Sequence, residues 1–283
     1  MPEIILEPAM PYSLAQSAAG ANPSRRFAGA VLETVFEADG APAYVRVGQR
    51  PDGSLATTVE CDALEAAIGT LRFMLALDVD HRPFLEMADG DPLLRDVVSR
   101  RRGLRPVRTA TVAQALLQAI AGQLITAAEA RRIEWRITAR AGRTHRGLAL
   151  PPTAADLRRL SPAELTRFGL APRRAAALAR IVRTMELDRL RDVDTARAVA
   201  RIERERTMGP WSAGVIALSG LGRFEHGLVG DLGLIKLCGH LLGRPATETD
   251  TARLLAPYGG WAGLASVHLL AHPLARRRTA LAA

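Results

Sequence analysis

The sequence predicts an α+β protein in which a small antiparallel β-sheet lobe with helices precedes a mainly α-helical, two-lobed body. Two observations predict this fold class. The first third of the chain contains segments that alternate apolar and polar residues with a period of two, which is typical of half-buried strands. From about Asp91 onward, apolar residues recur with helical spacing, and short connections marked by glycine or proline separate the segments.

Composition and charge narrow the class of protein. The chain has 283 residues, of which 48% are hydrophobic, enough for more than one core. Its net charge of +9, carried mostly by arginine, favours polyanionic partners, although charge alone does not single out nucleic acid. The apolar runs are too short to span a membrane, and no basic segment precedes an apolar one at the N-terminus. With only Cys61 and Cys238, a four-thiolate metal site is excluded and a reduced, cytoplasmic protein is expected.

The N-terminal lobe is predicted to cover residues 1–88. Strands are expected at 27–36, 43–50 and 54–60, and the Pro-Asp-Gly turn between the last two predicts a hairpin. A helix is expected over 62–77, because Asp62 and Glu65 have capping-box spacing and the apolar residues that follow have helical period.

The helical body is predicted to cover residues 89–283. Its clearest start signal is Ser161, which precedes Pro162 and stands three residues before Glu164. Helical patterns cover 111–126, 127–142, 161–169, 172–185, 195–205, 211–220, 231–242 and 260–270. The body divides into a central lobe of about 112–223 and a second lobe of about 89–111 plus 224–283.

A tight connection between two helices is predicted at 202–214. One helix ends near Arg206, and the next begins at Trp211. A glycine-containing hairpin of this kind points backbone N–H groups outward at the start of its second helix, which favours an anion. It can therefore hold a DNA phosphate without reading the base sequence, although an ordinary corner between two helices fits the same pattern. The candidate phosphate-binding residues are Thr207, Met208, Gly209, Trp211 and Ser212.

A single carboxylate, Asp231, begins the next apolar helix in a run of leucine, glycine, valine and isoleucine. A polar group buried there without partners would cost about 2–7 kcal/mol. Asp231 is therefore expected to cap the helix, to take part in chemistry, or to do both.

This arrangement resembles the helix-hairpin-helix (HhH-GPD) DNA glycosylases, in which an essential aspartate follows the hairpin and one helix. The stretch 116–133 is similar to the family's helix around Ala-Ile-x-Gly-Gln, and 150–182 is similar to the helical section after it. The β-rich start followed by a helical body resembles the bacterial DNA-3-methyladenine glycosylase II type. The resemblance covers nearly the whole chain and is strongest from about residue 70 to 270.

The resemblance implies a monofunctional DNA glycosylase of base excision repair. Such an enzyme flips an alkylated base, here an N-methylpurine, and hydrolyses its N-glycosidic bond to leave an abasic site. Asp231 would be the catalytic carboxylate, stabilising the positive charge that develops on the sugar. Trp211 stands where strand-cutting members carry a Schiff-base lysine, so no lyase activity is expected. The implied DNA wedge is Gln123 and Leu124, and the implied base pocket is Trp211, Val215 and Leu270.

Two departures from the family pattern bear on these expectations. Thr207 replaces the usual first glycine of the hairpin, which implies strain if that position has a positive φ. The same replacement puts in doubt a monovalent cation that hairpin carbonyls would hold. Aromatic residues are only 4% of the chain, and Val215 and Leu270 stand where aromatic rings are expected, which predicts a wider pocket.

The alternatives left open are a catalytically altered DNA-damage-binding protein and a glycosylase for bulkier adducts. A helix-turn-helix regulator is disfavoured, because the helix after the hairpin begins with apolar and small residues rather than base-reading ones. No cofactor and no metal site are expected, since His226 and His240 lack a second ligand at metal-binding spacing. The expected partner is double-stranded DNA containing damaged bases, not a membrane. The protein is expected to be a cytoplasmic monomer that associates with the nucleoid when bound to DNA.

Overall fold

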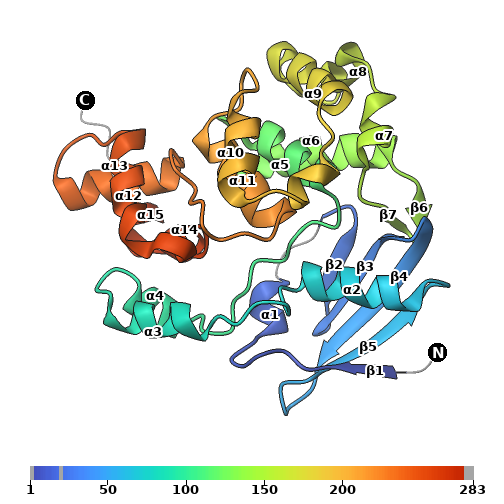
Figure 1. Cartoon of the computed structure of the whole chain (residues 1–283), viewed down its shortest axis with the longest axis horizontal. Coiled ribbons are helices and arrows are strands. Elements are labelled where there is room, and N and C mark those ends of the chain that lie inside the picture. Colours follow the sequence, from blue (N-terminus) through green and yellow to red (C-terminus); the bar gives the residue numbers. More distant parts are fainter. Residues whose placement is uncertain (1–2, 19–21, 277–283) are drawn as a thin grey trace.

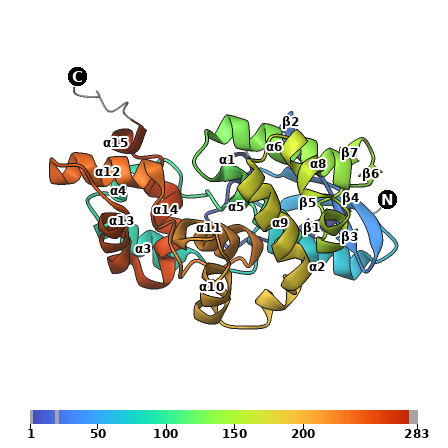
Figure 2. The same cartoon turned by 90° about the horizontal axis from the view of Figure 1, so that it is seen from above.

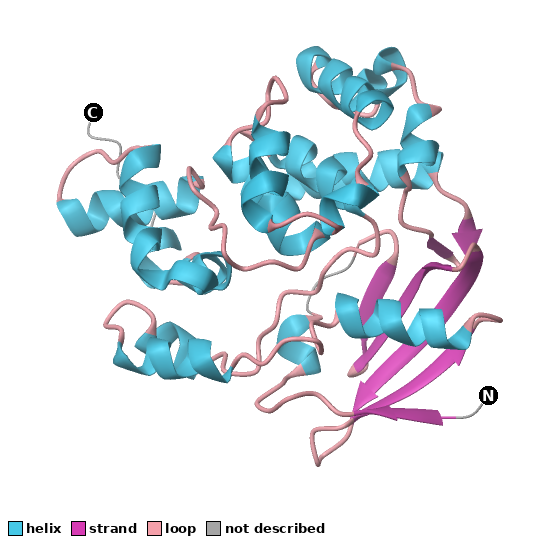
Figure 3. Ribbon diagram, viewed as in Figure 1, coloured by secondary structure: helices cyan, strands magenta, loops and turns pink. Residues whose placement is uncertain are grey.

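The computed structural model describes residues 3–18 and 22–276. A β-sheet lies at one end of the molecule, and helices make up the rest (Figures 1 and 3). The predicted α+β class, with an antiparallel sheet ahead of a helical body, is confirmed.

The sheet has the antiparallel strand order β1-β5-β4-β3-β2. Its strands are β1 (Glu3–Leu6), β2 (Arg25–Ala28), β3 (Val31–Ala38), β4 (Ala41–Gln49) and β5 (Leu55–Glu60). Buried and partly exposed residues alternate strictly along β5, so one face of this strand carries the apolar residues. These residues pack beneath α2 (Leu64–Met74), which crosses the sheet, and α1 (Leu14–Ser17) closes the same core.

Two predictions for this lobe are wrong in detail. The single strand expected at 27–36 is split into β2 and β3, because Gly29 and Ala30 both have positive φ, 57° and 63°, and form a two-residue turn. The capping box expected at Asp62 is not formed. The helix begins at Leu64, and Ala63, its N-cap residue, makes no side-chain cap bond.

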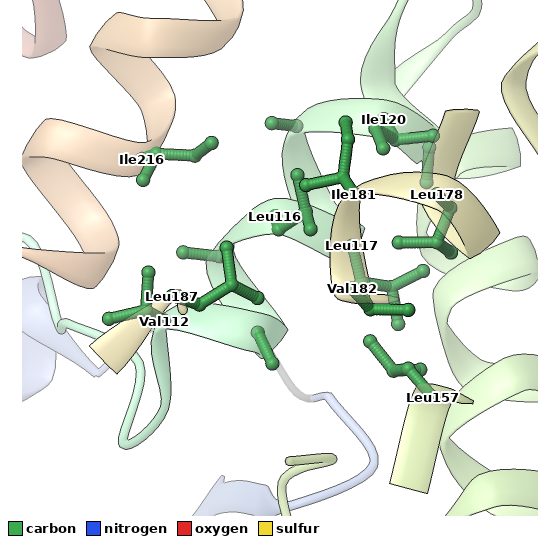
Figure 4. Packing of buried hydrophobic residues seen from close by; sticks show 14 of the residues in the cluster. Val112, Leu116, Leu117, Ile120, Leu157, Leu178, Ile181, Val182, Leu187 and Ile216 are labelled. Atoms are coloured by element: carbon green, nitrogen blue, oxygen red, sulfur yellow. The ribbon is translucent and has the colours of Figure 1, made fainter. Parts of the chain in front are cut away.

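The central lobe is built around α5, whose apolar side chains point at helices on several sides (Figure 4). Its elements are α5 (Val112–Gly122), α6 (Ala127–Ala141), β6 (Thr144–His145), β7 (Leu148–Ala149), α7 (Ala154–Arg158), α8 (Pro162–Arg167), α9 (Pro172–Thr184), the 3-10 helix η1 (Asp188–Arg191), α10 (Thr195–Glu203), α11 (Pro210–Val215) and the π-helical turn η2 (Ile216–Gly220). Leu116, Leu117 and Ile120 are fully buried, and each such side chain contributes about 1.5–3 kcal/mol to stability.

The predicted start of α8 is confirmed. The Ser161 hydroxyl accepts from the Glu164 backbone N–H at 3.2 Å, and the Glu164 carboxylate accepts from the Ser161 N–H at 2.9 Å. Pro162 occupies the first turn, where no backbone donor is needed. This helix start depends only on neighbouring residues, which is why the sequence predicts it.

The second helical lobe combines two distant parts of the chain. Its elements are α3 (Arg82–Gly90), α4 (Arg95–Ser99), α12 (Leu232–Leu242), α13 (Glu248–Leu255), the 3-10 helix η3 (Ala256–Trp261), α14 (Ala262–Leu269) and α15 (Pro273–Arg276). α3 and α4 lie alongside the C-terminal helices in both views (Figures 1 and 2), and share one apolar core with them. Residue 88, the predicted end of the first domain, falls within α3, and the domain limits stay a prediction.

Arg108 lies on the segment that leads from this lobe into α5. Its side chain is only 1% exposed, pairs with Asp78 at 2.7 Å and donates to the Gly222 carbonyl at 3.0 Å. Its guanidinium also lies over the Phe73 ring. Arg108 therefore joins α2, the connection before α3 and the segment that follows η2.

Within the residues that the structure describes, no helix has the length and apolar character needed to cross a membrane.

Candidate active site

Asp231 is the N-cap residue of α12, and both of its carboxylate oxygens accept a hydrogen bond. Oδ1 accepts from the Gly233 backbone N–H at 2.7 Å, and Oδ2 accepts from the Trp211 indole Nε1–H at 2.9 Å. The side chain is partly exposed. The helix start thus fixes one oxygen and a ring from the other lobe fixes the second, so that the carboxylate has a defined direction.

Trp211 reaches Asp231 from the first turn of α11, where Pro210 is the first residue. The indole lies against Gly122 at the end of α5, where a Cβ would lie 2.8 Å from Cη2 of the ring. Only glycine leaves room for the ring at this position. Trp211 is therefore held between the end of α5 and the start of α12.

The other two predicted pocket residues lie at the same junction between the lobes. Val215 follows Trp211 by one helical turn, and Leu270 directly follows α14. A Cβ at Gly233 would lie 2.5 Å from Cδ2 of Leu270 and 3.2 Å from Oδ1 of Asp231, so Leu270 packs beside the carboxylate. Trp211, Val215 and Leu270 are all partly exposed at the edge of the second helical core. The structure brings these residues together, while their role as a base pocket stays a prediction.

The hairpin between α10 and α11 contains the strained residue that the sequence points to. Thr207 has φ +85°, a region that a β-branched residue rarely adopts, and its hydroxyl is buried without a partner among the described residues. Met208 is buried in the central core and anchors the turn. Gly209, the N-cap residue of α11, has an ordinary extended backbone with φ −105°. The strain lies at Thr207 and not at the hairpin's glycine.

The structure separates the two residues predicted to form the wedge. The helix expected over 111–126 ends at Gly122. Leu124 has φ +54° and is 83% exposed, an unusual position for a leucine. Gln123 instead turns toward the hairpin, where its amide donates to the Thr207 carbonyl at 2.8 Å and to the Ser212 hydroxyl at 3.0 Å. Ser212 is accordingly buried against Gln123.

Sequence reasoning missed both of these long-range contacts, the indole–carboxylate bond and the amide–hairpin bonds. The only signal for either is the glycine before Gln123, whose lack of a side chain admits the indole ring. A cavity of about 30 Å³ elsewhere in the molecule contributes nothing to this site. Polar residues such as Ser24, Arg25 and Gln114 line it, and it holds at most a few water molecules. Among the described residues, no group of three or more His, Cys, Asp and Glu side chains is arranged to hold a metal ion.

No protein-family model matches the chain. Over 219 residues it is 30% identical to a Mycobacterium tuberculosis protein described as a probable bifunctional transcriptional activator/DNA repair enzyme AlkA. The match covers 75% of this chain but 44% of that protein, so the chain spans less than half the length of this relative. It is 27% identical over 206 residues to a Bacillus subtilis DNA-3-methyladenine glycosylase, covering 68% of this chain and 67% of the relative.

The fold has a close match among solved structures. The 3-methyladenine DNA-glycosylase of Archaeoglobus fulgidus superimposes with a TM-score of 0.79 over 96% of this chain and 97% of that one. The two sequences are 20% identical, so this likeness shows the fold alone.

Proposed function

We propose that the chain is a monofunctional glycosylase of the helix-hairpin-helix (HhH-GPD) superfamily and of the 3-methyladenine type, acting on alkylated bases in double-stranded DNA. The observation that carries this proposal is Asp231, a carboxylate with both oxygens oriented, at the junction of two lobes and beside an indole ring. The family names of the relatives agree with this assignment but do not by themselves identify the substrate.

The proposed reaction uses this carboxylate at the sugar. The damaged nucleotide leaves the stack, and the electron pair of the C1′–N bond departs with the base, so that a cationic N-methylpurine leaves as a neutral one. Positive charge then develops on the deoxyribose, and Asp231 stabilises it. Water adds to C1′, its proton passing to the carboxylate, and the product is an abasic site.

The chain's amines support a reaction without strand cleavage. Trp211 offers no primary amine, and the only lysine in the chain, Lys236, is exposed on α12. A lyase step would need an amine that attacks C1′ to form a Schiff base. We therefore propose that water is the nucleophile and that breaks appear only when abasic sites are treated with alkali.

The remaining partners follow from the same proposal. Phosphate binding is assigned to the hairpin 202–214 and wedging to Leu124, supported by the net charge of +9 and the exposure of that leucine. No cofactor is proposed. The proposal that the hairpin works without a bound cation rests on Thr207, which stands where the related hairpins usually have glycine. The proposal includes a monomer, and a DNA substrate would place it in the cytoplasm at the nucleoid.

A second candidate is a glycosylase for bulkier adducts. Val215 and Leu270 present aliphatic rather than aromatic side chains beside Trp211, which leaves a less restrictive lining. A panel of duplexes carrying methylated and bulky alkylated bases distinguishes the two. Release of compact 3-methyladenine alone would exclude the bulky-adduct proposal.

The test is base release from methylated duplex DNA by the wild type and Asp231→Asn, with products examined before and after alkali. The matched control is Asp194→Asn, because Asp194 caps α10 in the same way, accepting from the Arg197 N–H at 2.8 Å. We expect Asp231→Asn to abolish release while DNA binding is kept, and Asp194→Asn to remain active. If the wild type binds duplex DNA but frees no base, the chain is instead a damage-binding protein.

A further inference from the structure

Three consecutive residues, the last of α5 and the two that follow it, lie at different parts of the proposed site. Gly122 lies under the Trp211 ring that bonds Asp231. Gln123 bonds the hairpin, and Leu124 projects from the surface. The hydrogen bonds of Gln123 are long-range contacts, because its partners Thr207 and Ser212 lie more than 80 residues later in the sequence. The segment is therefore a junction between the carboxylate, the hairpin and the exposed leucine.

Leu124 needs support on both sides to stay where it is. Its φ of +54° lies in the left-handed region, which leucine seldom occupies, and its side chain gains little from packing because it is 83% exposed. On the C-terminal side, Thr126 begins α6 with a complete capping box to Glu129. On the N-terminal side, α5 has already ended, and within the part of the chain that the structure describes the Gln123 side chain bonds the hairpin alone.

Gln123 is chemically suited to this position. A glutamine amide has two N–H donors, and here one points to the Thr207 carbonyl and the other to the Ser212 hydroxyl. Methionine has the same reach but no donor, and glutamate replaces both donors with acceptors that would face the carbonyl. The requirement is thus for the amide and not merely for a side chain of this size.

We propose that Gln123 is a positioning residue, and not a wedge residue, that couples the exposed Leu124 to the hairpin. The proposal deepens the proposed function and rests on it. The hairpin holds the DNA backbone, Gln123 transmits its position to the next residue, and Leu124 is thereby aligned with the base stack. Removing the amide leaves the hairpin and Leu124 intact but lets the leucine move relative to the DNA.

The test compares Gln123→Met with Leu124→Ala and with the double variant. The matched control is Gln118→Met, because Gln118 lies five residues earlier, on α5, and its amide donates to buried Glu134 at 3.0 Å. Insertion is followed with a duplex that carries a tetrahydrofuran abasic analogue next to 2-aminopurine, whose fluorescence changes when stacking is disturbed. Base release from methylated DNA, affinity for undamaged duplex and thermal midpoints are measured in parallel.

We expect Gln123→Met to slow insertion and base release about tenfold, the size expected for losing one or two hydrogen bonds. Affinity for undamaged duplex should change less than about twofold, since the phosphate contacts remain. In the Leu124→Ala background the same substitution should have little further effect, because the residue it positions is gone. We expect Gln118→Met to lose as much thermal stability as Gln123→Met without slowing the insertion of Leu124.

Two results would overturn the proposal. One is an equal effect of Gln123→Met with and without Leu124, which would make Gln123 act by itself. The other is a loss of insertion no larger than that of Gln118→Met, which would make its role structural only. A wild type that frees no base, yet inserts Leu124 at the abasic analogue, would refute the glycosylase activity while leaving the coupling supported.

Discussion

Replacing Thr207 with glycine should stabilise the protein. Thr207 has φ +85°, and the left-handed region costs an L-residue about 1–2 kcal/mol, with a β-branched side chain among the least tolerant. Its hydroxyl is also buried without a partner among the described residues, and an unsatisfied polar group costs about 1–3 kcal/mol. Glycine removes both penalties and keeps the carbonyl that Gln123 binds.

Against these gains stands the greater freedom of glycine in the unfolded chain, which costs about 0.4–1 kcal/mol. The net expectation for Thr207→Gly is a free energy of unfolding higher by about 1–5 kcal/mol, and a Tm higher by about 2 °C or more. The variant keeps the backbone N–H groups of the hairpin and the carbonyl that Gln123 binds, so the phosphate contacts proposed for the hairpin should be retained, and affinity for duplex DNA is measured alongside.

The assay is urea and thermal unfolding of the wild type, Thr207→Gly and Thr207→Val. Valine has the shape and branching of threonine but lacks the hydroxyl, so it reports the unpaired hydroxyl with the backbone strain left in place. We therefore expect the Thr207→Gly variant to be more stable than the Thr207→Val variant. A glycine variant less stable than both the wild type and the valine variant would refute the argument from backbone strain.

Two further predictions concern the indole contact and the buried histidines. Gly122→Ala places a Cβ 2.8 Å from the Trp211 ring, so it should cost about 1–3 kcal/mol and reduce base release by moving the indole from Asp231. The control in unfolding and activity assays is Gly220→Ala, because the added Cβ would lie 2.7 Å from Ala115 and clash there without touching Trp211. Equal losses of activity in the two variants would contradict the role of the indole. Burial, reinforced by nearby arginines, lowers the pKa of both His81 and His268 to about 4. Between pH 6.5 and 4 the unfolded state binds protons that the folded state does not, so the free energy of unfolding should fall with pH by up to about 3 kcal/mol per histidine. In urea unfolding, His268→Leu should make the free energy of unfolding depend less on pH. An unchanged pH dependence would show that the buried His268 is not its cause.

The sequence predicts the features that depend on neighbouring residues and misses those that depend on contacts between distant segments. The Ser161 capping box and the N-cap position of Asp231 depend on residues within one turn, and both are found. The strand β1 at Glu3–Leu6 escapes prediction because it is defined by pairing with β5, some fifty residues away.

The candidate site shows the same division. The family resemblance leads to Asp231, Trp211 and Leu124 one at a time, but no pattern indicates that the indole of Trp211 bonds the carboxylate. Nor does any pattern separate Gln123 from Leu124, since both follow an apolar helical run. Their opposite directions arise from the left-handed backbone at Leu124 and from hairpin acceptors on a distant segment.

The position of Trp211 bears on how this protein can diversify. Its ring fills the space over Gly122 and donates to Asp231, and the residue stands one helical turn before Val215. A substitution of Trp211 therefore alters the packing, the orientation of the carboxylate and the proposed lining together. Among the contacts described, neither Val215 nor Leu270 donates a hydrogen bond to the carboxylate in addition to its packing. Over evolutionary time, changes in the range of accepted lesions are therefore expected to accumulate at these two aliphatic positions, with the tryptophan kept. Directed evolution toward a new lesion should begin with libraries at Val215 and Leu270.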